Sequence, residues 1–97
     1  GGVYHFSGGE HRQNLELVEE LCRILDRLKP GHAPYETQIA FVQDRPGHDR
    51  AYAIDDAATR TALGWEHKHR LSTALESTVA WYLANSAWCA RRQRCAA

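Results

Sequence analysis

The sequence predicts an α+β fold, built as a small mixed unit of short strands and three helices. Apolar residues recur at three- and four-residue steps over residues 14–28, which is the period of a helix with one buried face. Short β-prone runs at residues 3–6 and 39–42 flank this stretch. A strand, a helix and a strand in this order indicate a βαβ unit with parallel pairing.

The helix over residues 14–28 has recognisable ends. Asn14 is the candidate N-cap, because its side-chain oxygen can accept a free backbone N–H of the first turn. Glu16 lies in that first turn, where a carboxylate complements the helix dipole. The helix is expected to stop at Pro30-Gly31, because proline cannot continue it.

Three short strands are expected around this helix. The first, at residues 3–6, ends at a Ser-Gly-Gly turn signal. The second, at residues 39–42, follows a polar loop over residues 30–37. A third brief strand is predicted at residues 52–54, after a loop that the Pro46-Gly47 pair marks.

Two more helices are expected in the second half of the chain. The first covers residues 57–63, with Asp55 or Asp56 as its cap and Gly64 as its left-handed stop. The last covers residues 72–87 and is rich in apolar side chains. Together these elements suit one small domain of 97 residues with a modest core.

Composition excludes several classes of protein. Twelve basic residues balance twelve acidic ones, whereas a duplex-DNA binder normally carries a basic excess. No apolar run approaches the roughly 20 residues that span a bilayer. The cysteines show no disulfide-framework spacing, so reduced thiols and a cytoplasmic location are expected. They are Cys22, Cys89 and Cys95.

The most concentrated polar cluster is the loop over residues 44–50. Its Pro46-Gly47 pair can hold a set shape, because proline fixes its φ and glycine permits unusual φ. Arg45 presents a planar fork that suits a diphosphate, and His48 offers a further donor. A solvated loop with internal Arg–Asp pairs is the simpler interpretation from physics alone.

Asn14 also has two interpretations. As an N-cap it only satisfies a backbone N–H. A helix N-terminus also attracts anions, and the nearby Arg12 would favour a phosphate there. The plain cap is the simpler of the two.

Recognisable catalytic, cofactor and metal motifs are not found in this sequence. No glycine-rich dinucleotide turn follows a β-prone run, and neither Lys29 nor Lys68 has the tyrosine four residues earlier that short-chain dehydrogenases use. The close pair His67 and His69 lacks the further ligands of a zinc site, so a surface pair is expected.

Several segments together resemble the C-terminal end of the dTDP-glucose 4,6-dehydratases, a family of extended short-chain dehydrogenases/reductases. The most specific segment is Asp-Arg-Pro-Gly-His-Asp-Arg, residues 44–50, followed by Tyr-Ala-Ile-Asp, residues 52–55. The others are Val-Tyr-His-Phe-Ser-Gly-Gly at 3–9, Asn-Leu-Glu-Leu-Val at 14–18, Leu-Gly-Trp at 63–65 and Thr-Val-Ala-Trp-Tyr-Leu-Ala-Asn at 78–85. The family usually has asparagine where His5 stands, and the sequence leaves the family pattern after Trp88.

The resemblance implies roles for particular residues. Substrate-binding positions of the family correspond to Asn14, Asp44, Arg45, Pro46, Gly47 and His48. Arg45 would hold the diphosphate of a dTDP-sugar, and Asn14 would add a hydrogen bond there. No residue of this chain corresponds to a catalytic, cofactor-binding or metal-binding position of the family.

The resemblance also implies a larger parent enzyme. That enzyme, a lyase, converts dTDP-glucose to dTDP-4-keto-6-deoxyglucose with bound NAD. Residues 1–88 would form part of its substrate-binding side, and residues 89–97 a divergent, frayed tail. The expected partners are the dTDP-sugar and an N-terminal Rossmann domain, in a homodimeric parent; neither nucleic acid nor membrane is expected as a partner. The chain alone is expected to bind no NAD and to be inactive.

Two alternatives to this function remain open. The chain could belong to another nucleotide-sugar enzyme, such as an epimerase or a decarboxylase, although fewer of these share the full string at residues 44–55. It could also be a non-catalytic interaction module without a ligand. Binding of dTDP separates the module from both enzyme interpretations.

Overall fold

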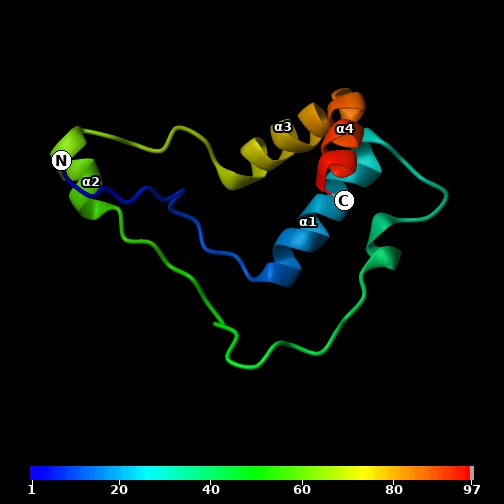
Figure 1. The fold of residues 1–97 in the computed structure, drawn as a ribbon, viewed down its shortest axis with the longest axis horizontal. Coiled ribbons are helices and arrows are strands. Elements are labelled where there is room, and N and C mark those ends of the chain that lie inside the picture. Colours follow the sequence, from blue (N-terminus) through cyan, green and yellow to red (C-terminus); the bar gives the residue numbers. More distant parts are fainter. Residues whose placement is uncertain (97) are drawn as a thin grey trace.

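The computed structural model describes residues 1–96, and its regular elements are all helical. They are α1 (Asn14–Leu28), the 3-10 helix η1 (Tyr35–Gln38), α2 (Ala57–Leu63), α3 (Leu71–Ala84) and α4 (Ser86–Ala96). Helices α1, α3 and α4 gather at one end of the molecule, and α2 lies with the N-terminus at the other end (Figure 1). Long irregular segments connect the two ends.

The predicted α+β fold is wrong, because no strand forms within residues 1–96. The three β-prone runs at residues 3–6, 39–42 and 52–54 are irregular instead. Phe41 and Val42 remain 83% and 86% exposed. A β-strand forms only when its backbone groups can hydrogen-bond to a neighbouring strand. β propensity describes how well a side chain fits a half-buried sheet, so it does not produce a strand where no partner is present.

Helix α1 has the predicted bounds, but its cap is a different residue. Gln13 occupies the N-cap position, and its backbone N–H donates to the Glu16 carboxylate at 3.0 Å. Asn14 is therefore the first residue of the helix, and its side chain is not the cap that we expected. At the other end, the N–H of Lys29 donates to the carbonyl of Leu25 at 2.8 Å.

The core lies where α1 packs against α3. Among residues 1–95, whose burial is described, the hydrophobic side chains that are buried are Cys22 and Ile24 of α1 and Val79 of α3. An ion pair between Arg27 and Glu76, at 2.9 Å, joins the two helices at their surface.

The 3-10 helix η1 folds back onto α1. The backbone N–H of Tyr35 donates to Asp26 at 3.0 Å, and its hydroxyl donates to the carbonyl of Lys29 at 2.8 Å. Burial, together with the nearby carboxylates of Glu36 and Asp26, raises the pKa of the Cys22 thiol. Cys22 is thus buried, and its raised pKa favours the protonated thiol.

Helix α2 confirms the predicted bounds and stop signal. Gly64 ends it with φ +61°, a left-handed conformation that glycine adopts without a steric penalty. The N-terminal segment packs onto this region, because the N–H of His5 donates to the Thr59 hydroxyl at 3.1 Å. Phe6 also meets Trp65 edge to face, with ring centroids 5.0 Å apart.

The last predicted helix, over residues 72–87, is divided in two. Helix α3 stops at Ala84, and the Asn85 side chain donates to the carbonyl of Trp81 at 2.8 Å. The chain then resumes as α4, which continues to Ala96 over most of the segment for which a frayed tail was predicted. Trp88 packs edge to face against Trp81 with centroids 5.3 Å apart, and Arg92 lies 5.4 Å from the Trp88 ring. The Trp81–Trp88 contact joins α4 to α3, whereas the Arg92–Trp88 contact lies within α4.

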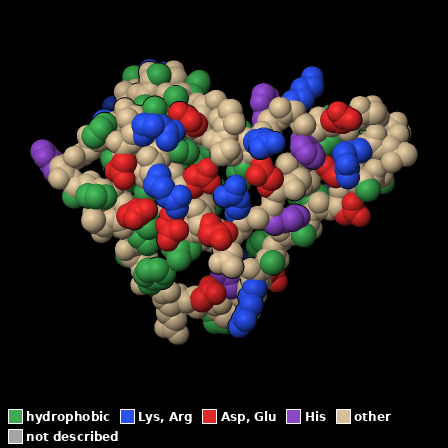
Figure 2. Space-filling model, turned by 180° about the vertical axis from the view of Figure 1, so that it is seen from behind, with side chains coloured by type: hydrophobic (Ala, Val, Ile, Leu, Met, Phe, Trp, Pro, Cys, Tyr) green, Lys and Arg blue, Asp and Glu red, His purple; other side chains and the backbone are tan. Residues whose placement is uncertain are grey.

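The chain is unusually open for its length. Its radius of gyration is 17.2 Å, whereas a compact domain of about 100 residues has roughly 13 Å. Large apolar side chains stay accessible, including Trp81 at 47% and Tyr82 at 52%. Hydrophobic atoms are visible on the surface over the helical end (Figure 2). None of the helices within residues 1–96 is long and apolar enough to cross a bilayer.

We expect the isolated chain to be marginally stable, because so few apolar side chains are buried. Far-ultraviolet circular dichroism should show helix, near-ultraviolet signals should be weak, and a dye for apolar surface should bind. A sharp cooperative transition above ~60 °C, near the top of the usual mesophile range, without dye binding, would contradict this expectation.

Candidate functional site

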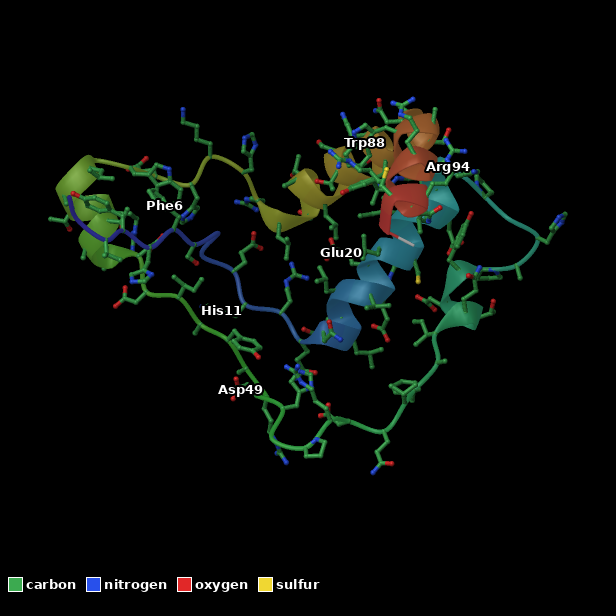
Figure 3. All side chains as sticks on the ribbon, in the orientation of Figure 1. Phe6, His11, Glu20, Asp49, Trp88 and Arg94 are labelled. Atoms are coloured by element: carbon green, nitrogen blue, oxygen red, sulfur yellow. The ribbon has the colours of Figure 1, made fainter. Side chains whose placement is uncertain are left out.

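A cleft of about 960 Å³ lies between the start of α1 and the loop that follows residue 41. We call it the loop cleft. Residues 12–15 and 17 form one wall, and residues 42–44, 48–50 and 52 form the other. Figure 3 shows Asp49 on this loop, below the segment that carries His11 and leads into α1. The cleft thus unites two segments that are far apart in the sequence.

The loop contains the tight turn that its Pro-Gly pair predicts. The N–H of His48 donates to the carbonyl of Arg45 at 3.3 Å, which closes a four-residue turn. Gly47 has φ +70°, as a type II turn requires at its third residue, and Pro46 occupies the second position. The turn reverses the chain and places Asp44 beside His48.

Asp44 is the hydrogen-bonding centre of this loop. Its Oδ1 accepts the backbone N–H of Arg45 at 2.9 Å and contacts Nδ1 of His48 at 2.5 Å. The hydrogen bond with His48, helped by the charge of the imidazole and by the Arg45 N–H, lowers the pKa of Asp44. Asp44 therefore stays ionised at neutral pH.

The arginines of the loop do not form the expected internal Arg–Asp pairs. Within the described residues, neither Arg45 nor Arg50 makes an ion pair, and both are exposed. Asp44 is instead paired with His48. Both guanidinium groups consequently keep their donors available for a ligand.

The six predicted substrate-binding residues divide into two groups. Asn14, Asp44 and His48 all line the loop cleft. Arg45, Pro46 and Gly47 lie in the turn and are not part of its walls.

The cleft walls also include residues that were not singled out from the sequence, among them Arg50 and Tyr52. Arg50 belongs to the same charged string as Arg45, which was the only available signal. Arg12, considered above only as a neighbour of Asn14, also lines the cleft.

The chemistry that the loop cleft offers is recognition of a polar anion. It combines guanidinium groups, a side-chain amide and a carboxylate–imidazole pair, and arginine matches phosphate oxygens with its planar fork. No group of three or more metal-ligating side chains occurs in the part of the chain that the structure describes.

Comparison with known proteins identifies relatives over most of the chain. No protein-family model matches. The chain is 44% identical over 90 residues to a dTDP-glucose 4,6-dehydratase of Xanthomonas campestris, covering 91% of this chain and 26% of that protein. It is 40% identical over 88 residues to dTDP-glucose 4,6-dehydratase 1 of Escherichia coli, covering 91% of this chain and 24% of that protein.

This chain is homologous to part of the dTDP-glucose 4,6-dehydratases. A relative in Neisseria meningitidis with the same name is 44% identical over 92 residues. The resemblance inferred from the sequence motifs is therefore confirmed. The chain spans about a quarter of the length of these dehydratases.

We expect His48→Ala to raise the pKa of Asp44 toward its ordinary value, because the hydrogen bond with His48 is the main cause of its lowering. The pKa of Asp44 is lower in the folded chain than in the unfolded chain. The contact with His48 therefore stabilises the loop fully at pH values above the unfolded-state pKa of Asp44. Its contribution is lost as the pH falls through the folded pKa. Side-chain carboxyl NMR across an acid titration measures this.

The matched control for this titration is His67→Ala, because His67 packs beside Trp65 at the other end of the molecule. The Asp44 titration should be unchanged in that variant. An Asp44 midpoint that does not move in His48→Ala would show that the pair does not form in solution.

Proposed function

We propose that this chain forms the sugar-nucleotide-binding side of a dTDP-glucose 4,6-dehydratase. The observation that carries the proposal is the loop cleft, because it brings Asn14 together with Asp44 and His48. These residues come from two of the segments that resemble the family. The homology to dehydratases over 91% of the chain supports the choice of ligand.

The proposed contacts to the dTDP-sugar come from the six residues predicted from the sequence. They are Asn14, Asp44, Arg45, Pro46, Gly47 and His48. Arg45 lies beside the cleft and makes no ion pair with a described residue, so its fork is available to the diphosphate. Asp44 and His48 would meet hydroxyl groups, because a carboxylate accepts hydrogen bonds and an imidazole can donate them.

The dehydration itself is proposed for a complete enzyme, in which NAD takes and returns a hydride. The residues described here do not fit NAD. A dinucleotide site of that type needs a strand, a glycine-rich turn and a helix in succession, and residues 1–96 form no strand. We therefore assign NAD and the catalytic groups to a Rossmann domain outside this chain.

Exposed apolar side chains support contact with such a domain. Val42, which lines the loop cleft, and Phe41, which precedes it in the chain, are 86% and 83% exposed. Patches of this kind are typical of interfaces. Without the partner domain the chain is expected to bind substrate weakly and to turn none over.

Calorimetric titration of the chain with dTDP tests the proposed function. Saturable binding is expected, with dTDP-glucose binding at the same site and NAD giving no saturable heat. A non-catalytic interaction module predicts no response to dTDP. The absence of dTDP binding at millimolar concentration would therefore contradict the proposal.

In a complete dehydratase that carries this segment, we expect Arg45→Lys to raise the KM for dTDP-glucose more than it lowers kcat. Lysine keeps the charge but loses the planar fork, which should cost about 1–3 kcal/mol of binding. Steady-state kinetics measures both parameters. Arg94→Lys, on α4, is the control, and an unchanged KM with a collapsed kcat for Arg45→Lys would indicate a catalytic role instead.

A further inference from the structure

Two arginines outside the predicted set line the loop cleft. Arg12 belongs to the wall at the start of α1, and Arg50 belongs to the wall formed by the loop. Asn14 lies on the same wall as Arg12. A phosphate group in the cleft could therefore meet a guanidinium from each wall.

Arg12 is held in place by two carboxylates. Its Nη1 donates to Glu20 at 3.2 Å, and its Nη2 lies 3.7 Å from Glu10. Glu10 in turn accepts the backbone N–H of Leu71 at 2.6 Å, which ties it to the first residue of α3. The Glu20 side chain is only 18% exposed, so the better of the two anchors is itself well packed.

This arrangement has a cost and a benefit for anion binding. The two carboxylates offset the positive charge of Arg12, so it contributes little net attraction. They also fix a long, flexible side chain before the ligand arrives, which reduces the entropy lost on binding. Arg12 has five N–H donors in a rigid fork, and the Glu20 hydrogen bond uses only one of them.

We propose that Arg12 and Arg50 bind the diphosphate of the nucleotide ligand from the two walls of the cleft, and that Glu20 positions Arg12. The inference rests on the proposed function, because that function supplies the diphosphate. Arg50 makes no ion pair with a described residue and supplies the net positive charge. Glu20 is a positioning residue, since it acts through Arg12.

Glu20→Gln separates positioning from simple electrostatics. Replacing a carboxylate with an amide makes the neighbourhood of the cleft more positive, so electrostatics alone predicts tighter dTDP binding. Loss of the anchor on Arg12 predicts weaker binding. The direction of the change in Kd therefore decides between the two effects.

The experiment is calorimetric titration of the chain and its variants with dTDP and with thymidine. We expect Arg12→Gln to weaken dTDP binding about tenfold, the scale of a lost hydrogen bond to a charged group. Thymidine binding should be unaffected by it. Arg12→Lys should recover part of the loss, and Glu20→Gln should weaken dTDP binding by a smaller factor.

Arg23→Gln is the matched control. Arg23 lies on α1, pairs with Glu19 and Glu36, and is not part of the loop-cleft wall. The variant Arg23→Gln removes the same charge as Arg12→Gln but lies outside the cleft. Its affinity for dTDP should therefore stay within twofold of that of the parent chain. Far-ultraviolet circular dichroism of every variant checks that helix content is kept.

Each outcome bears on a different claim. If the parent chain binds dTDP and Arg12→Gln binds it equally well, the role of Arg12 is wrong while the proposed function stands. If Glu20→Gln binds more tightly, the positioning role of Glu20 is wrong. If the parent chain does not bind dTDP at all, the proposed function fails and this inference fails with it.

Discussion

The packing of α1 against α3 is the contact on which the rest of this structure depends. Helix α1 contributes Cys22 and Ile24 to the buried hydrophobic side chains of the described chain, and α3 contributes Val79. The 3-10 helix is attached to α1 through Tyr35, and α4 is attached to α3 through its aromatic contacts. One wall of the loop cleft is the beginning of α1 itself. The position of the site therefore depends on α1, the helix that contributes two of the three buried hydrophobic side chains.

The α+β fold class was predicted wrongly because the three expected strands are irregular segments. Local patterns specify a helix within its own residues, so the spacing of residues 14–28 and the stop at Gly64 were enough to place α1 and α2. A strand depends on a partner that local sequence does not contain. The apolar runs around Val3 and Phe41 have the residue types that are common in strands, but no described segment pairs with them. The break between α3 and α4 was missed because Asn85 ends the helix through a side-chain bond that periodicity does not reveal.

The loop cleft was predictable in its residue types but not in its geometry. The Pro46-Gly47 pair indicated a turn, and the turn is present. The sequence could not show which arginine of the string faces Asn14, because that depends on how the turn reverses the chain. Arg50 lies on the cleft wall, whereas Arg45 lies in the turn. Asn14 was assigned as the cap, but Gln13 is the N-cap, and Asn14 is the first residue of α1 and lines the cleft.

The charge balance of the loop shows how a chain with no net charge can still offer an anion site. Asp44 could have neutralised a neighbouring arginine, but the tight turn brings His48 to it instead. That pairing leaves Arg50 on the cleft wall without a described ionic partner. On the opposite wall, Arg12 keeps a fixed orientation because Glu20 holds it. Opposite charges are intermixed over the surface (Figure 2), so local pairing, rather than total charge, determines where an anion is attracted.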